Sequence, residues 1–236
     1  MKNGIVIFIL LICITNCLFS QKDAQIKYPD ELPLKEYYVK GASDYLVIMY
    51  TGDGGWKSLA LGMADYFQSK QVPFVGLDVR KYFWTKKNQT EITASLEKII
   101  SYYCTEWHKN KVVLIGYSFG AEVLPFAAGE INNDLKLKIK KIIMIAPGQK
   151  AAFEVTIGSM LDFSGDGLPV APELAKIRAD AFFVLCDDSE DALCTVLDRH
   201  YDFSILKGGH HFDGDFEDLY QSIWNKINIA DKGQLQ

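Results

Sequence analysis

The chain reads KVVLIGYSFG at positions 111–120, and this stretch decides the fold. Its apolar first part, Lys111–Gly116, is typical of a strand that is buried on both faces. The residues that follow, Phe119–Glu130, predict an apolar helix. Between them stands G-x-S-x-G, a pattern typical of a sharp strand-to-helix turn in which side chains at the glycine positions would crowd the backbone. Such a turn lifts the hydroxyl of Ser118 above the end of the strand; the alternative is a structural serine in a tight turn.

Outward from this turn, buried apolar runs alternate with segments of helical periodicity. The predicted strands are Leu34–Lys40 (an edge strand), Tyr45–Tyr50, Pro73–Val79, Lys111–Gly116, Ile139–Ala146, Ala181–Leu185 and Phe203–Leu206. The predicted helices are Ser58–Lys70, Thr90–Trp107, Phe119–Glu130 and Phe216–Ile227. This order predicts a mostly parallel sheet with helices on both faces and an active site outside the carboxyl ends of the strands. With the serine turn, it indicates an α/β-hydrolase fold over residues 34–230, with a small cap or none formed by residues 148–180.

A serine hydroxyl needs a base before it can act as a nucleophile. Two of the four histidines, His108 and His200, are expected to be solvated residues near the ends of elements. The other two follow the last predicted strand, directly after Gly208-Gly209, where a flexible turn would let an imidazole reach Ser118. We favour His210 as the base over His211.

The base in turn needs a carboxylate that holds its tautomer and stabilises its charge. The segment 186–194, between the serine and the histidine, reads CDDSEDALC and offers four carboxylates where the order Ser…Asp…His expects one. We favour Asp191, then Asp188 and Glu190; the other carboxylates would belong to a solvated acidic loop. A disulfide between Cys186 and Cys194 would fix the shape of this loop.

The tetrahedral intermediate of acyl transfer needs two backbone N–H groups that stabilise its negative oxygen. Phe119, directly after the serine, is expected to supply one. The glycine-rich loop 51–55 is expected to supply the other, from Asp53. Further candidates for contact with the substrate lie in this loop, beside the serine and in the aromatic segment 78–84: Gly52, Gly54, Trp56, Tyr117, Tyr82 and Trp84.

The composition limits the function classes. The formal net charge of −5 argues against a nucleic-acid partner, because phosphate-binding surfaces carry a basic excess. Residues 1–20 have Lys2 followed by a short apolar run and a small residue at the end, which predicts a cleaved secretory signal and a periplasmic protein. Acylation of Cys17 in a poor lipobox is the weaker alternative. Residues 21–33 are expected to be a polar leader, and no cysteine pair has zinc-ligand spacing, so we expect neither metal nor organic cofactor.

Four segments together resemble the bacterial virulence protein family of VirJ and AcvB. They are residues 51–56, 78–84, 116–126 and 208–216, and the similarity extends over roughly residues 40–225. The resemblance implies a periplasmic hydrolase; members related to AcvB cleave the aminoacyl ester of lysyl-phosphatidylglycerol, and VirJ is tied to export of virulence substrates. The chain departs from the family pattern at Cys186-Asp187-Asp188, which leaves the register of the acid open.

The sequence therefore predicts an exported serine hydrolase that cleaves an ester through an acyl-enzyme. The substrate would be an ester, and the resemblance implies that of a membrane aminoacyl-lipid reached by peripheral contact. Acidic side chains at Asp53, Asp78 and the loop 187–191 would suit a cationic acyl group. Two alternatives remain: a generic periplasmic esterase for a soluble substrate, and a non-catalytic partner of an export machine that keeps the fold. The sequence does not indicate an oligomeric state.

Overall fold

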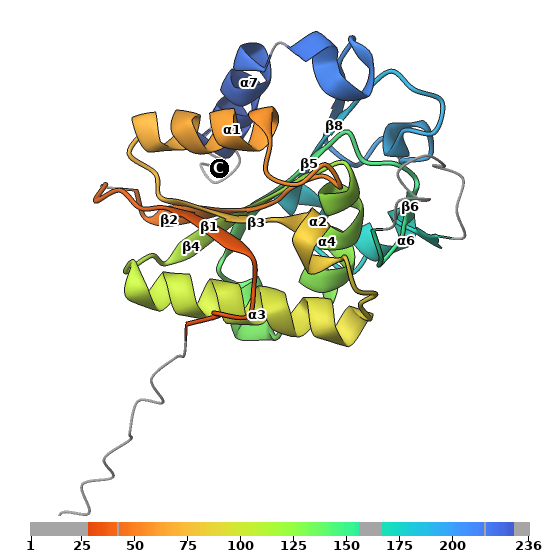
Figure 1. Cartoon of the computed structure of the whole chain (residues 1–236). Helices are drawn as coiled ribbons and strands as arrows, with labels where there is room; N and C mark the ends of the chain where they lie inside the picture. Colours follow the sequence, from red (N-terminus) through yellow and green to blue (C-terminus); the bar gives the residue numbers. More distant parts are fainter. Residues whose placement is uncertain (1–27, 42, 156–166, 215, 229–236) are drawn as a thin grey trace, which may run out of the picture.

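The computed structural model describes residues 28–41, 43–155, 167–214 and 216–228 (Figure 1). The predicted signal, Cys17 and most of the leader lie outside the described residues. The strands are β1 (Leu34–Tyr37), β2 (Tyr45–Tyr50), β3 (Phe74–Leu77), β4 (Lys111–Tyr117), β5 (Ile139–Ile145), β6 (Lys150–Ala151), β7 (Leu168–Pro169), β8 (Phe182–Cys186) and β9 (Phe203–Ile205). The α-helices are α1 (Ser58–Ser69), α2 (Val79–Tyr82), α3 (Gln89–Glu106), α4 (Phe119–Glu130), α5 (Asn133–Lys136), α6 (Ala171–Leu174) and α7 (Glu217–Asn228).

The main sheet has seven strands in the order β1-β3-β2-β4-β5-β8-β9. Strand β1 is antiparallel to β3, and the other neighbours are parallel. The sheet with its helices is the α/β-hydrolase fold that the sequence predicts. Because the strands β3, β2, β4, β5 and β8 run parallel, their carboxyl ends lie at one edge of the sheet. The loops that follow these strands therefore open at that edge.

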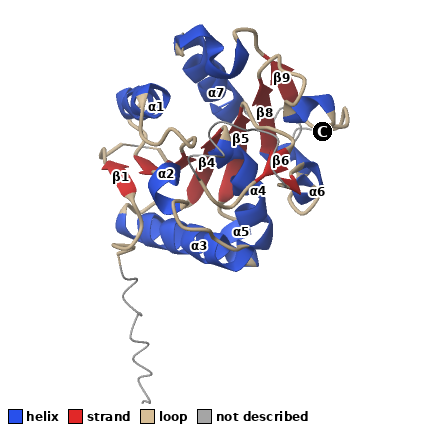
Figure 2. Cartoon of the chain, turned by 45° about the vertical axis from the view of Figure 1, so that its right-hand side comes forward, coloured by secondary structure: helices blue, strands red, loops and turns tan. Residues whose placement is uncertain are grey.

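Helices cover both faces of this sheet (Figure 2). Alternate residues of β2 show the division: Leu46, Ile48 and Tyr50 pack with α3 and α4, whereas Val47 and Met49 pack with α1 and α7. All six residues of β2 are buried, which explains the continuous apolar run in the sequence.

Three segments differ from the sequence-based expectations. The segment after β3 forms the short helix α2, capped by the side chain of Asp78, which accepts a hydrogen bond from the Lys81 N–H. A short helix, α5, precedes β5. The described parts of the predicted loop or cap, 148–155 and 167–180, contain the two-stranded β6/β7 sheet and α6. Among the described residues, no helix is both long and apolar enough to cross a membrane.

Candidate active site

Ser118 occupies the sharp turn between β4 and α4. Its backbone angles, φ 52° and ψ −123°, lie in a region that non-glycine residues rarely adopt. The flanking glycines make the turn possible: a Cβ on Gly116 would lie 2.5 Å from the Cα of Ala121, and one on Gly120 would lie 2.4 Å from the carbonyl oxygen of Thr51. The strand–turn–helix geometry expected from G-x-S-x-G is therefore present.

His210 is in hydrogen-bond contact with the serine. Its Nε2 lies 2.7 Å from Ser118 Oγ, the geometry that a general base requires. The glycines before it allow this reach, since Gly208 and Gly209 have φ of 104° and 61°. A Cβ on Gly208 would lie 2.9 Å from the backbone of Phe212, so the turn can close only with glycine there.

His211 points elsewhere. Its Nδ1 lies 3.0 Å from the hydroxyl of Tyr117, and that hydroxyl donates to the carbonyl oxygen of His210 over 3.1 Å. Tyr117 thus ties the histidine loop to the strand that carries the serine. Burial, with the charges of Asp53 and Asp187, raises the pKa of Tyr117 to about 12, so the phenol keeps its proton at neutral pH.

The carboxylate behind His210 belongs to Asp187, and the sequence-based preference for Asp191 is wrong on this point. Asp187 Oδ2 lies 2.9 Å from His210 Nδ1, and the side chain is 3% exposed. Burial acts to raise the pKa of Asp187, but hydrogen bonds from the Ser189 side chain and N–H, and then from His210, outweigh it and hold this pKa below its usual value. The acid is therefore ionised at neutral pH, as the partner of an imidazolium must be.

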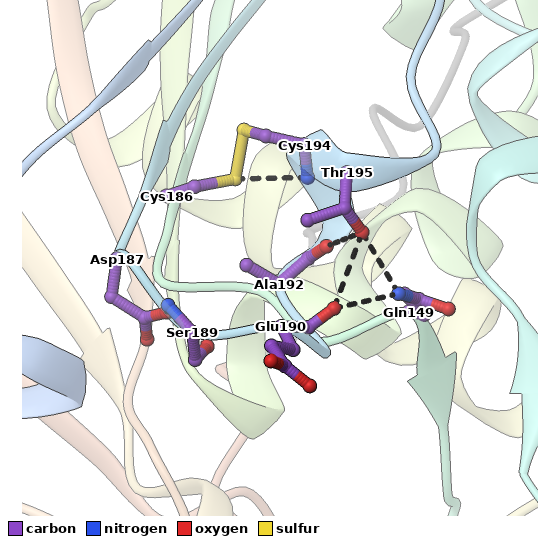
Figure 3. The surroundings of a disulfide bond; sticks show 8 residues. All are labelled: Gln149, Cys186, Asp187, Ser189, Glu190, Ala192, Cys194 and Thr195. Carbon is purple, nitrogen blue, oxygen red and sulfur yellow. Dashed lines mark hydrogen bonds between the residues drawn. A yellow bond between two sulfur atoms is a disulfide. The ribbon is translucent and has the colours of Figure 1, made fainter.

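Strand geometry explains why Asp187 has this position. It directly follows Cys186, the last residue of β8, and β8 pairs with β9, the strand that leads into the histidine loop. Asp191 is held on the other side of the loop, because its carbonyl oxygen accepts from the Gln149 N–H over 3.1 Å and Leu193 donates to the carbonyl of Pro147. Figure 3 shows Asp187 and Gln149 on opposite sides of this segment.

The two other acid candidates also have different places. Asp188 Oδ1 accepts from the Gly209 N–H over 3.1 Å, so it holds the backbone of the histidine loop rather than the imidazole. Glu190 is exposed, and its carbonyl oxygen accepts from Gln149 and Thr195 (Figure 3).

The predicted disulfide between Cys186 and Cys194 is present and closes the acid loop (Figure 3). Cys186 ends β8 immediately before Asp187, and Cys194 lies in a short helical turn that is anchored to the loop after β5. The bridge therefore fixes the loop at both of its ends. Cys104, the cysteine without a bridge in the described chain, is buried in the core, as its place in an apolar helical stretch indicated.

A pocket of about 570 Å³ opens at the serine. Its lining includes Ser118, His210 and the candidate contact residues Gly52, Gly54 and Tyr117, together with Asp53. Of the two expected oxyanion donors, Phe119 directly follows Ser118 at the first position of α4, where a helix has no internal acceptor for its N–H, and Asp53 lines the same pocket.

Three of the expected contact residues do not line this pocket. The Trp56 ring stacks on Tyr37 and donates from its Nε1 to the Tyr37 hydroxyl. The Tyr82 hydroxyl bonds to Ser95 and to the carbonyl of Glu91, which places this ring in the core. Trp84 lines a neighbouring hollow instead, to which Trp56 also contributes. Aromatic content indicated a binding segment, but packing between sheet and helices accounts for Trp56 and Tyr82.

Sequence reasoning missed Glu122, one turn into α4 from the serine. Its Oε1 accepts from the Gly148 N–H over 3.1 Å. Burial raises the pKa of Glu122 to about 7; that hydrogen bond opposes the rise, and the charges of Asp53 and Asp191 add to it. The charges of Asp53 and Asp191 therefore both reach Glu122, but of these three carboxylates only that of Asp53 lines the serine pocket. The Asp78 carboxylate, which was also expected near the site, caps α2 instead.

The fold and the contacts among Ser118, His210 and Asp187 define the class: a serine hydrolase of the α/β-hydrolase fold. Within that class, the chain belongs to the family of the bacterial virulence protein VirJ, whose family model matches residues 44–231.

Solved structures with the same fold include a carboxylesterase of the thaumarchaeon Nitrososphaera gargenis (TM-score 0.57, 11% identity, 82% of this chain and 94% of that chain). They also include the esterase Pf2001 of Pyrococcus furiosus (TM-score 0.56, 11% identity, 85% and 95%). A third is the ferulic-acid complex of Est1E from Butyrivibrio proteoclasticus (TM-score 0.53, 15% identity, 84% and 97%). No curated protein matches the sequence.

Proposed function

We propose that this chain is an exported ester hydrolase that works through an acyl-enzyme. The observation that carries the proposal is the continuous line of contacts from Ser118 Oγ through the His210 imidazole to Asp187, 2.7 Å and 2.9 Å long. His210 takes the serine proton as Oγ attacks the ester carbonyl, and then gives that proton to the departing alcohol. Water releases the acyl group by the same steps in reverse order, with the N–H groups of Phe119 and Asp53 holding the negative oxygen.

We propose further that the acyl group is cationic, as in the aminoacyl ester of lysyl-phosphatidylglycerol. Asp53 lines the serine pocket, and its charge and that of Asp191 both act on Glu122. An ammonium group in this pocket would be attracted by the Asp53 carboxylate, whereas a neutral or anionic acyl group would not. The family resemblance supports the same substrate.

A fluorophosphonate probe tests the nucleophile. The wild type is expected to be labelled, and Ser118→Ala is expected to lose both labelling and at least about a thousandfold of kcat on a soluble ester. A folded wild type that takes no label would contradict the enzyme and favour a non-catalytic partner role.

Paired esters test the acyl preference. Lysine and norleucine esters of one alcohol have similar length and differ in the terminal charge. The expected result is a kcat/KM at least about tenfold higher for the lysine ester, since a charge pair in a partly buried site contributes that much. Release of lysine from lysyl-phosphatidylglycerol vesicles extends the test to the lipid. Equal rates on both soluble esters and intact lipid would instead indicate a generic esterase.

A further inference from the structure

A second hollow lies on the other side of the glycine loop from the serine. Its volume is about 660 Å³, and Lys35, Arg80, Lys81, Trp84 and Asp78 contribute to its lining. The two cavities share Gly54 and Gly55, so a thin backbone ridge without side chains separates them. A molecule with its ester at Ser118 could therefore extend across this ridge into the hollow.

The hollow carries an excess of positive charge. Asp78 is its one acid in the described lining, and that carboxylate is already engaged: it caps α2 and lies 3.8 Å from the Lys81 ammonium. Lys35 and Arg80 have exposed side chains, and no carboxylate of the described chain lies within ion-pair distance of either. These two cations thus remain available to a ligand.

Cations also stand on both sides of the ridge. A Cβ on Gly55 would lie 3.3 Å from Arg80 Cβ and 3.0 Å from Asp78 Oδ1, which places Arg80 against the ridge on the hollow side. On the serine side, a Cβ on Gly54 would lie 3.5 Å from Lys57 Nζ, and Lys57 lines the serine pocket. Any side chain on either glycine would stand between these groups and a ligand on the ridge.

From this arrangement we infer that the hollow is an anion subsite for the alcohol part of the ester, recognising a phosphate group. A guanidinium and an ammonium suit a phosphate oxygen pair, and the ring of Trp84, 54% exposed, offers a flat apolar wall beside them. The Asp53 carboxylate of the serine pocket and the cations of the hollow would then select the two ends of one substrate. The role of the hollow in recognising the ester rests on the proposed ester hydrolysis. The binding of an anion in the hollow does not depend on that proposal.

Anion binding can be measured without catalysis. Inorganic phosphate and glycerol phosphate serve as soluble probes, and phosphatidylglycerol vesicles, against phosphatidylcholine vesicles, serve as the lipid-borne probe, all at one ionic strength. The variant Lys35→Gln/Arg80→Gln removes two charges from the hollow. The control Lys40→Gln/Lys86→Gln removes two charges from exposed positions outside its lining.

The expected result is a Kd for at least one probe that rises about tenfold or more in Lys35→Gln/Arg80→Gln and less than about twofold in the control. Loss of vesicle binding alone would assign the subsite to a lipid headgroup, and loss of glycerol phosphate binding as well would show that the free headgroup suffices. Equal weakening in both double variants, or none in either, would overturn the inference. Fluorophosphonate labelling of the same proteins reports on the nucleophile separately, so a failed subsite is distinguishable from a failed enzyme.

Discussion

At the scale of single residues, two neighbouring carboxylates have separate tasks. Asp187 contacts the imidazole of His210, and Asp188 holds the backbone N–H of Gly209. Ser189 in turn donates to Asp187 from both its N–H and its hydroxyl. The orientation of the His210 ring and the position of the histidine loop are therefore both fixed by three consecutive residues after β8, Asp187 to Ser189.

The assignment of the acid leads to a substitution test. Asp187→Asn is expected to lower kcat by about a hundredfold to ten-thousandfold, because the amide no longer stabilises the imidazolium and favours the wrong tautomer. The measurement is ester hydrolysis with a neutral soluble substrate, checked against thermal unfolding to exclude misfolding.

Glu190→Gln is the matched control, since this exposed side chain lies in the same loop. It is expected to stay within about twofold of the wild type, as do most surface substitutions. Asp191→Asn is expected to retain far more activity than Asp187→Asn. A loss in Asp191→Asn as large as in Asp187→Asn would refute the assignment of the acid.

At the scale of elements, the sequence predicted the central strands, the serine turn and the glycine turn before His210, because each is set by local chemistry. A buried parallel strand needs an apolar run, and positive φ needs glycine, as at Gly208. The acid could not be fixed in this way. Its identity depends on which side of the loop 187–194 packs against residues 147–149, and that contact joins distant segments. The position directly after a strand end was nevertheless a usable signal for Asp187.

The acid loop as an element predicts a dependence on its disulfide. The variant Cys186→Ala/Cys194→Ala, or reduction of the wild type, is expected to lower the free energy of unfolding by about 2–3 kcal/mol. Because Asp187 directly follows one half of the bridge, kcat is expected to fall by about tenfold through misplacement of the acid. Ester kinetics and thermal unfolding give the two quantities. Cys104→Ala, in α3, is the control for loss of a thiol; unchanged kcat after full reduction would contradict the positioning role.

Helix α4 contains a pH-sensitive group in Glu122. The pKa of this carboxyl is raised from an ordinary value of 4.5 to about 7 in the folded chain. Between these two values the unfolded chain has released its proton and the folded chain has not, so stability falls as pH rises through this window. Glu122→Gln is expected to remove that fall, by up to about 3 kcal/mol and less where solvent reaches the side chain. Thermal unfolding of the wild type and Glu122→Gln from pH 4 to 8 measures this difference. The same dependence of stability on pH in both proteins would contradict the raised pKa of Glu122.

At the scale of the whole molecule, one edge of the sheet carries every group of the proposed chemistry. Ser118 follows β4, Asp187 follows β8, His210 follows β9, and the glycine loop follows β2. The two core clusters consist in their greater part of residues from strands and helices, with Leu193 of the acid loop and Phe212 of the histidine loop among the exceptions. Substrate preference can therefore depend on exposed residues such as Lys57, before α1, and Arg80, in α2, without cost to the core.

The disulfide and the sequence of residues 1–20 together predict the compartment of the protein. A bridge between Cys186 and Cys194 persists where thiols are oxidised, and residues 1–20 have the features of a cleaved secretory signal. We therefore expect the protein in the periplasmic fraction, beginning at Gln21, with both cysteines unreactive until it is reduced. Intact mass and thiol labelling of fractionated cells measure this; a lipid adduct at Cys17 would indicate the lipoprotein instead. A chain without residues 1–20 is the control, and it is expected to stay in the cytosol with free thiols and a lower kcat. Full-length chain with reduced cysteines as the main form in cells would contradict export, because an exported chain loses its signal and meets an oxidising compartment.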